Sequence, residues 1–445
     1  MSSVFKEYDI RGVYGTELTE ALAYDIGRAF VTFLGCSKVA VGRDVRTHSE
    51  PLFRELVRGI NYQGADVVDL GLSSTPISYF GNASLGCDAG IMITASHNPK
   101  EYNGFKLSRA GAVPISGATG IRDIERIVMD KAFAPLPARR GEVVMADVFD
   151  AYRANVQKTA RIGRRVRIAA DFANGMGILE GRALAGLPID IDPLFDTFDG
   201  SFPNHEGNPL HHETLAALQS KVRAGAYDFG VAFDGDADRA GFIDEKGDII
   251  PMDLITAFVA QDLLSREKGV VFYDLRSSWA VREAIEAAGG TPMMSRVGHA
   301  FIKQQMRENN AIFAGELSGH YYFRDNFTTE SSAMAVVALA NIVSNADKPL
   351  SELVRPLRRY FASGEINTKL ADRAQAIAVM HELRRRYGSR GKLLELDGVS
   401  VEMDDWWFNV RCSNTEPLLR LNMEAKTEAD MERHRDELLA IIRAK

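Results

Sequence analysis

The sequence predicts an α/β protein of three similar domains with mixed or parallel sheets, followed by an α+β domain, all placed around a central cleft. Apolar strands alternate with amphipathic helices along most of the chain, and one order of strand, helix, strand and polar loop occurs three times. After residue 363 the pattern changes to short alternating segments, which are typical of antiparallel strands. We expect domains at 1–150, 151–250, 251–362 and 363–445.

The first round of the repeat leads to a serine. The expected elements are helix 19–34, strand 39–42, helix 49–63, strand 66–69, helix 76–85 and strand 91–93. The last strand ends abruptly in the polar run Thr94–Pro99, which contains Ser96 beside His97. A serine next to a histidine is a candidate nucleophile, although Ser, Asn and Pro are also common at an ordinary strand-to-loop corner.

The second and third rounds end in polar loops of the same kind. Strands are expected at 166–171, 189–191 and 229–233, then at 270–274, 292–295 and 311–314, with a helix at 280–288. The final strands of these rounds run into the loops 234–239 and 315–320. Because ligands gather beyond the carboxyl ends of parallel strands, three such loops facing one cleft predict a composite site.

The tail is expected to form a separate domain. It should contain a helix within 369–387, strands at 393–396, 399–403, 407–410 and 418–424, and a last helix at 428–444. A polar loop, 411–417, interrupts the strands.

Composition narrows the class of protein. The 445 residues are 46% hydrophobic and 25% charged, as in ordinary globular proteins. A net charge of -7 argues against a nucleic-acid or membrane-surface role, because no basic excess exists. The three cysteines are odd in number and widely spaced, so they indicate neither a disulfide framework nor a zinc site. With no signal-peptide pattern and no membrane-length apolar run, we expect a cytoplasmic protein, monomeric or weakly dimeric.

Three aspartates indicate a metal site. Asp234, Asp236 and Asp238 occupy alternate positions after an apolar strand, so their oxygens can converge on Mg²⁺. A calcium EF-hand is the rival interpretation, but Arg239 stands where that loop requires glycine.

Two further loops indicate a sugar and a phosphate. Gly315–His320 places Glu316, Ser318 and His320 at alternate positions, where they can exchange hydrogen bonds with hydroxyl groups, and His320 can also move a proton. In the loop after residue 410, a guanidinium, two hydroxyls and an amide suit a phosphate; these are Arg411, Ser413, Asn414 and Thr415. Both loops could also be ordinary turns.

Together these loops resemble the α-D-phosphohexomutase family over essentially the whole chain. T-A-S-H-N-P followed by Y-N-G-F-K, and G-E-L-S-G-H, are similar to the bacterial phosphomannomutase/phosphoglucomutase group. The resemblance implies that Ser96 is a phosphoserine that exchanges its phosphoryl group with hexose 1-phosphate and 6-phosphate through a mannose or glucose 1,6-bisphosphate that reorients.

The resemblance also assigns roles to single residues. An oxygen of phosphorylated Ser96 would join the three aspartates on Mg²⁺. Arg11, His97 and Arg239 would stabilise charge on the phosphoryl group, and Lys106 would act as general acid/base with help from His320 or His299. Glu316 and Ser318 would bind the sugar hydroxyls, and Arg276 would keep a positive charge where relatives often carry lysine.

One segment departs from the family pattern, and three alternatives remain open. The segment Asn326–Ser332 lacks an Asp-Ser-Gly or Asp-Asp-Gly pattern and has no assigned role. The alternatives are a phosphoglucosamine mutase, a catalytically silent sugar-phosphate-binding protein and a Mg²⁺-dependent phosphatase. The intact serine, aspartates and lysine weigh against the silent protein, because a pure binder needs no metal cage.

Overall fold

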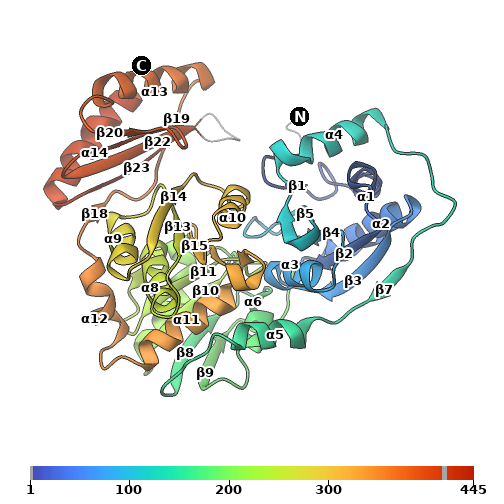
Figure 1. Ribbon diagram of the computed structural model, residues 1–445, viewed down its shortest axis with the longest axis horizontal. Coiled ribbons are helices and arrows are strands. Elements are labelled where there is room, and N and C mark those ends of the chain that lie inside the picture. Colours follow the sequence, from blue (N-terminus) through green and yellow to red (C-terminus); the bar gives the residue numbers. More distant parts are fainter. Residues whose placement is uncertain (1–3, 413–417, 445) are drawn as a thin grey trace.

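The computed structural model describes residues 4–412 and 418–444, which form four sheets with their helices (Figure 1). Each sheet defines one domain. Domain 1, blue to cyan in Figure 1, forms one lobe, and domain 4, red, lies above domain 3 in the other. The predicted fold class is confirmed.

Domain 1 has a mixed sheet of order β1-β5-β4-β2-β3-β7, with β6 beside β5. Its strands are β1 (Ile10–Val13), β2 (Lys38–Arg43), β3 (Asp66–Leu72), β4 (Ala89–Ile93), β5 (Tyr102–Arg109), β6 (Val113–Pro114) and β7 (Val143–Met145). Its helices are α1 (Glu20–Leu34), α2 (Ser49–Tyr62), α3 (Thr75–Ser84) and α4 (Ile121–Asp130).

Domains 2 and 3 repeat part of this order, β12-β11-β10-β8-β9 and then β14-β13-β15-β16-β17. Domain 2 contains α5 (Phe149–Gln157), β8 (Val166–Asp171), α6 (Gly177–Ala183), β9 (Ile189–Leu194), α7 (Ala216–Ala224), β10 (Phe229–Phe233), β11 (Ala240–Asp244) and β12 (Ile249–Ile250). Domain 3 contains α8 (Met252–Leu264), β13 (Val270–Asp274), α9 (Trp279–Ala287), β14 (Thr291–Ser295), α10 (His299–Glu308), β15 (Phe313–Gly315), β16 (Tyr321–Phe323), β17 (Thr329–Glu330), α11 (Ser332–Ser344) and α12 (Leu350–Val354).

An antiparallel strand beside the central strand of each repeat was not predicted, and neither were the strands β1, β6, β7, β12 and β17. β5, β11 and β16 run antiparallel to the central strands β4, β10 and β15. In β5 the polar side chains of Asn103, Lys106 and Ser108 are buried, because each has a hydrogen-bond partner inside the protein. Because these buried residues are polar, β5 lacks the alternation of apolar and polar residues by which strands are predicted.

Domain 4 is an antiparallel sheet of order β18-β23-β22-β21-β20, with β19 beside β23, covered by two helices. Its elements are β18 (Phe361–Ala362), β19 (Ile366–Lys369), α13 (Arg373–Tyr387), β20 (Lys392–Leu394), β21 (Val399–Glu402), β22 (Trp406–Cys412), β23 (Leu418–Ala425) and α14 (Glu428–Arg443). The predicted strands and helices of the tail are present.

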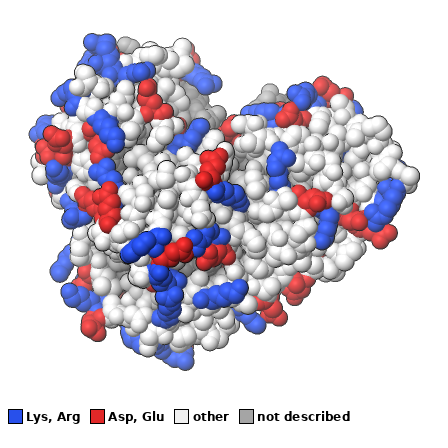
Figure 2. Space-filling model, viewed as in Figure 1, with Lys and Arg blue, Asp and Glu red and all other residues white. Residues whose placement is uncertain are grey.

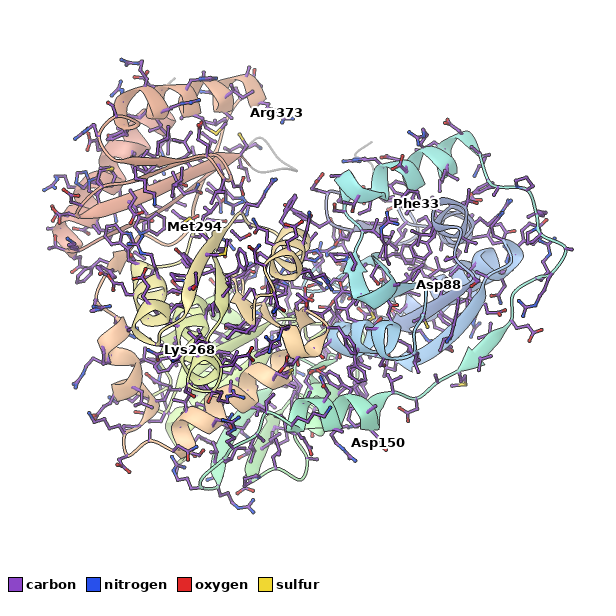
Figure 3. All side chains as sticks on the ribbon, in the orientation of Figure 1. Phe33, Asp88, Asp150, Lys268, Met294 and Arg373 are labelled. Carbon is purple, nitrogen blue, oxygen red and sulfur yellow. The ribbon has the colours of Figure 1, made fainter. Side chains whose placement is uncertain are left out.

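Domains 2 and 3 share one apolar core, to which domain 1 contributes residues such as Val68, Ile77 and Phe80. Domain 1 has a second core of its own, and domain 4 has a separate one. The shared core includes α8 and α11, whose residues are buried almost all round. Helices that are apolar on every side must be covered on every side, so these two join the sheets into one body. Figure 3 shows side chains filling the space between the sheets and their helices.

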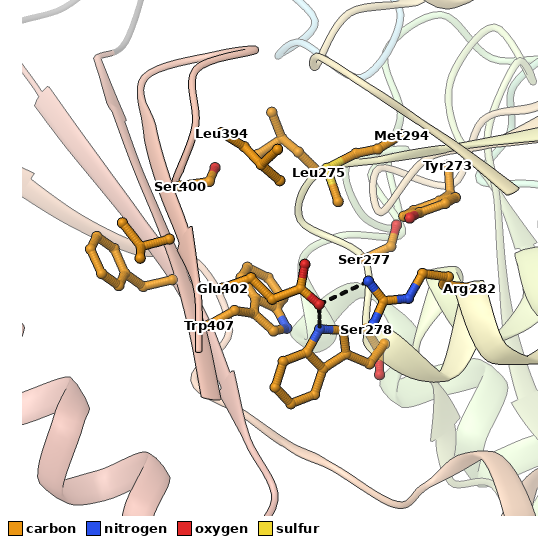
Figure 4. A pocket seen from close by; sticks show the side chains of 13 residues that line it. Tyr273, Leu275, Ser277, Ser278, Arg282, Met294, Leu394, Ser400, Glu402 and Trp407 are labelled. Atoms are coloured by element: carbon orange, nitrogen blue, oxygen red, sulfur yellow. Dashed lines mark hydrogen bonds and ion pairs between the residues drawn. The ribbon is translucent and has the colours of Figure 1, made fainter. Parts of the chain in front are cut away.

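Domain 4 contacts domain 3 through a polar and aromatic interface (Figure 4). Glu402 accepts hydrogen bonds from Trp279 Nε1 and Arg282 Nη1, both at 2.8 Å. The cavity beside them has a volume of about 30 Å³ and is lined in part by Met294 and Leu394. This interface holds the sheet of domain 4 against domain 3.

The surface in Figure 2 carries acidic and basic side chains intermixed, with a hollow between the two lobes. Within the described part of the chain, no helix has both the length and the apolar character needed to cross a membrane.

Candidate active site

Three strand ends deliver the predicted loops to one cleft. Ser96 follows β4, Asp234 follows β10 and Glu316 follows β15, each at the carboxyl end of a central strand. The cleft has a volume of about 480 Å³. Of the predicted residues it is lined by Arg11, Ser96, His97, Lys106, Asp238, Arg239, His299 and His320.

Ser96 is held in a strained, buried turn. Its backbone adopts φ +53°, a conformation that is uncommon for any residue with a side chain. Ser96 Oγ donates to Asp234 Oδ2 at 2.8 Å and lies 3.1 Å from His97 Nδ1. Burial, together with the charges of Arg239 and Arg11, holds the pKa of His97 well below its usual range. His97 therefore meets Ser96 as a neutral imidazole.

The three aspartates form a buried carboxylate cage. One oxygen from each of Asp234, Asp236 and Asp238 lies within 4.8 Å of the others. Oδ1 of Asp236 and Oδ1 of Asp238 are buried and have no hydrogen-bond partner among the described residues. Buried acceptors without a donor suit a hard cation, and carboxylate oxygens are the ligands that Mg²⁺ prefers. The donor set therefore fits a magnesium ion.

Glycine lets the carboxylate loop approach the serine loop. A Cβ atom on Gly235 would lie 2.5 Å from the carbonyl oxygen of Ser96, which is too close for any side chain. Thr75 Oγ1, at the start of α3, donates to Asp236 Oδ2 at 2.6 Å. Domains 1 and 2 thus meet at the predicted metal ligands.

Lys106 joins the same group from β5. Its Nζ donates to Asp236 Oδ2 at 2.6 Å and to Asp238 Oδ2 at 2.5 Å. Burial opposes the ammonium charge, but the two carboxylates outweigh it and hold the Lys106 pKa well above its usual range. Lys106 is therefore a cation that can donate a proton.

The pKa values of Asp238 and Asp234 are shifted in opposite directions. Burial opposes the Asp238 carboxylate, but Lys106 and His320 hold its pKa well below its usual range. Burial, followed by the charges of Asp236 and Asp238, raises the pKa of Asp234 well above its usual range.

The two predicted cleft arginines have different surroundings. Arg11 Nη1 donates to Asn98 Oδ1 at 2.6 Å, and its Nη2 pairs with Asp9. Arg239 Nε lies 3.3 Å from His320 Nε2 and 3.9 Å from Asp234 Oδ2. Arg239 thus bridges the metal-binding loop and the sugar-binding loop.

The sugar-binding loop is ordered by its own contacts. Ser318 Oγ lies 2.8 Å from His320 Nδ1, and Glu316 accepts from the Gly298 N–H at 3.2 Å and from Tyr322. His299 Nδ1 has no hydrogen-bond partner among the described residues and lies 3.9 Å from Glu330 Oε1.

Four predicted ligands of domains 3 and 4 are not part of this cleft lining, namely Glu316, Ser318, Arg276 and Arg411. Arg276 bonds both oxygens of Asp274, and Arg411 Nη2 donates to Glu365 Oε2 at 2.8 Å. Ser413, Asn414 and Thr415 lie outside the described residues.

Comparisons with known proteins agree with this geometry. The descriptions "Phosphoglucomutase/phosphomannomutase, alpha/beta/alpha domain" I, II and III match residues 2–135, 147–247 and 251–360, and that of the C-terminal domain matches 365–441. The chain belongs to the phosphoglucomutase/phosphomannomutase family.

Relatives in this family cover nearly the full chain. A phosphomannomutase of Escherichia coli K12 is 40% identical over 439 residues, 96% of each chain, and one of Methanocaldococcus jannaschii is 37% identical over 99% of this chain and 97% of the relative. A crystal structure of a phosphoglucomutase/phosphomannomutase family protein from Burkholderia thailandensis has a TM-score of 0.91 at 32% identity, covering 99% of this chain and 97% of the other.

Arg46 is a site residue of this family member that sequence reasoning missed. Its guanidinium donates to the carbonyl oxygens of Ser96 (2.9 Å), Asn98 (2.6 Å), Pro99 (2.8 Å) and Tyr102 (3.0 Å). The signal in the sequence was an arginine shortly after a strand of the first repeat, which by itself does not reveal that four carbonyl groups converge on it.

Glu330 is a second missed residue, and it explains the segment Asn326–Ser332. Lys303 Nζ, fully buried, donates to Glu330 Oε2 at 2.7 Å. Asn326 bonds Thr329 Oγ1 and the Glu330 carbonyl, both at 3.0 Å, and so shapes the turn. The segment therefore places a buried ion pair behind His299.

Proposed function

We propose that this chain interconverts hexose 1-phosphates and 6-phosphates, with mannose and glucose as the sugars, through a phosphoserine at Ser96. The observation that carries the proposal is the position of Ser96 Oγ, 2.8 Å from Asp234 in a buried carboxylate cage. Ser96 and Asp238 of this cage line a cleft of about 480 Å³. The similarity to phosphomannomutases of about 40% identity supports the choice of sugar.

The reaction consists of two phosphoryl transfers. In the first, the bond between phosphorus and Ser96 Oγ breaks while a bond forms to the free hydroxyl oxygen of the hexose phosphate. The hydroxyl proton leaves to a base in the cleft, Ser96 Oγ takes up a proton as it departs from phosphorus, and a 1,6-bisphosphate results. After the bisphosphate turns over, Ser96 Oγ gives up its proton and takes the other phosphoryl group, and a proton returns to the sugar oxygen. Lys106, held protonated by its carboxylate partners, would deliver that proton.

Asp234, Asp236 and Asp238 would hold the magnesium ion, which when bound offsets the charge of about -2 on a phosphoserine. Arg11 and Arg239, which both line the cleft, would neutralise charge on the moving phosphoryl group. His97, as a neutral imidazole, would orient Ser96 Oγ by a hydrogen bond.

Glu316, Ser318 and His320 would bind the sugar hydroxyls, and His299 would assist at one end of the ring. Arg276 would keep a positive charge beside this loop, and Arg411, with Ser413, Asn414 and Thr415, would hold the second phosphate. A mutase must exclude water while the bisphosphate reorients, so we expect domain 4 to close over the cleft.

Replacement of Ser96 by alanine tests the proposal. With catalytic bisphosphate present, we expect Ser96→Ala to lose conversion of mannose 1-phosphate and glucose 1-phosphate to their 6-phosphates. Intact-mass measurement should show one phosphoryl group on the native protein and none on the variant. Ser84→Ala, an exposed serine of the same domain, is the matched control. Undiminished turnover by Ser96→Ala would refute the phosphoserine route.

A panel of glucose, mannose and glucosamine phosphates tests the sugar. We expect comparable rates on the first two and a lower rate on the third. Chelation of divalent metal should abolish turnover, and added Mg²⁺ should restore it.

A further inference from the structure

Two arginines of domain 4 face each other across antiparallel strands. Arg411 on β22 and Arg420 on β23 are direct partners in register. Like charges directly opposite each other destabilise a strand pair, because their side chains share one face of the sheet. This pair therefore requires an anion between its guanidinium groups.

Glu365 supplies that anion in the structure. Arg411 Nη2 donates to Glu365 Oε2 at 2.8 Å, and Arg420 Nη1 donates to Oε1 at 3.1 Å. Glu365 follows Gly364, whose φ of +67° turns the chain between β18 and β19. The Glu365 side chain remains 22% exposed, so the carboxylate is not sealed inside the sheet.

One carboxylate is not enough for the charge gathered here. Arg276 Nη1, from domain 3, lies 3.7 Å from Glu365 Oε2, and Arg276 is otherwise paired with Asp274. The three guanidinium groups thus form ion pairs with two carboxylates, Glu365 and Asp274. The Nε atoms of Arg411 and Arg420 are buried and lack a hydrogen-bond partner in the described part of the chain. Burial, with the charge of Arg276, lowers the pKa of Arg411, as expected where positive charge is in excess.

The cluster is joined to the sugar-binding loop. Asp274, the partner of Arg276, accepts a hydrogen bond at Oδ2 from the N–H of Leu317 in that loop at 2.8 Å. His320 of the same loop lines the cleft. An anion on the arginine pair would therefore be close to a sugar held by that loop.

We propose that Glu365 is a built-in carboxylate ligand of the phosphate site in domain 4, that the sugar's non-reacting phosphate displaces it from Arg411 and Arg420, and that Arg420 is thereby a phosphate-binding residue. A phosphate dianion offers more charge and one more oxygen than a carboxylate, so it satisfies both guanidinium groups better. Before substrate arrives, Glu365 keeps the two arginines aligned. It also weakens phosphate binding, because the phosphate must replace an existing ion pair. The inference rests on the proposed function for the identity of the ligand.

The test measures binding without turnover. The affinity for mannose 6-phosphate and for inorganic phosphate is measured by titration calorimetry. The proteins compared are Ser96→Ala and the same protein with Glu365→Gln or Arg420→Gln added. A charge-assisted hydrogen bond contributes about 1.5–3 kcal/mol, so we expect Glu365→Gln to bind both ligands about tenfold more tightly. Arg420→Gln should bind about tenfold more weakly and respond less to salt, and Arg420→Lys should recover part of the loss.

The two variants are expected to change the affinity for phosphate in opposite directions, which distinguishes a role in binding from a purely structural role. If the triad only stabilises domain 4, both variants bind more weakly, and the proposal is wrong. A change of less than about twofold in Glu365→Gln overturns it as well. Arg384→Gln and Glu395→Gln are matched controls, since they form an exposed ion pair in the same domain. Failure of the Ser96→Ala parent to bind mannose 6-phosphate counts against the proposed function instead.

Discussion

Arg46 offers the most direct test of how the serine loop is held. Its side chain is 1% exposed, pairs with Asp44 at 3.2 Å and donates to four loop carbonyl groups. Arg46→Met removes all these donors and leaves the Asp44 carboxylate buried without its cation. Burial already raises the pKa of Asp44, so the lost partner is costly.

The magnitude follows from the pair. Removing one partner of a buried ion pair costs about 3–5 kcal/mol. Bonds from a charged donor to four carbonyls would add to this, but a neighbouring cleft of about 340 Å³, lined by Arg46, Ser96 and Asn98, lets water replace part of them. We therefore expect domain 1 to lose about 3–5 kcal/mol of unfolding free energy. A shift of Ser96 by about 1 Å would slow its phosphorylation by about 100-fold.

Tryptophan fluorescence and far-UV circular dichroism together show which domain loses stability. All three tryptophans, Trp279, Trp406 and Trp407, belong to domains 3 and 4. The tryptophan fluorescence transition in urea should therefore stay unchanged, while far-UV circular dichroism shows an earlier transition for domain 1. The phosphoryl content of the protein after incubation with bisphosphate, measured by intact mass against time, gives the phosphorylation rate.

A double variant separates charge from geometry. Asp44→Asn with Arg46→Met removes the unpaired carboxylate, so we expect more than half of the stability to return. The slow phosphorylation should persist, because the loop carbonyls still lack their donor. The reasoning fails if Arg46→Met costs less than about 1 kcal/mol or if the double variant is as unstable as the sum of the singles.

Three further predictions concern the interface, the loop contact and the buried pair. Burial raises the Glu424 pKa from 4.5 to about 7, so between these pH values the folded state keeps a proton that the unfolded state loses. The free energy of unfolding should therefore fall by about 3 kcal/mol as the pH rises from 4.5 to about 7. Glu424→Gln should reduce this pH dependence, measured by tryptophan-monitored unfolding at pH 5 and pH 8. Gly235→Ala places a Cβ atom 2.5 Å from the Ser96 carbonyl oxygen, so the serine loop must move. We expect Ser96 phosphorylation to slow about 100-fold while circular dichroism still shows a folded protein. A normal phosphorylation rate would contradict the contact. Lys303→Met should lower the free energy of unfolding by about 3–5 kcal/mol, because it leaves the Glu330 carboxylate unpaired. Adding Glu330→Gln should restore more than half of this loss in urea unfolding. Equal instability of the two proteins would count against a buried ion pair.

The repeat was predictable because it is local. Apolar strands followed by helices are visible in the periodicity, and polar loops such as Asp234–Arg239 follow those strands directly in sequence. Parallel strand topology places each of the serine, aspartate and Glu316 loops at the carboxyl edge of its own sheet. That the three loops share one cleft depends on how the three sheets pack, which the strand pattern alone does not determine. The antiparallel strand β5 was not predictable in this way, because its buried polar residues break the alternation.

By itself, the sequence determined the fold class, the order of the domains and the residue types of each loop, since these depend on neighbours along the chain. Only the tertiary structure decided which charges meet. Arg46 and the Ser96 carbonyl are 50 residues apart, Lys106 and Asp236 are 130 apart, and Arg411 and Glu365 are 46 apart. Such pairs leave no periodic signal, because their energy comes from burial and from the proximity that folding creates.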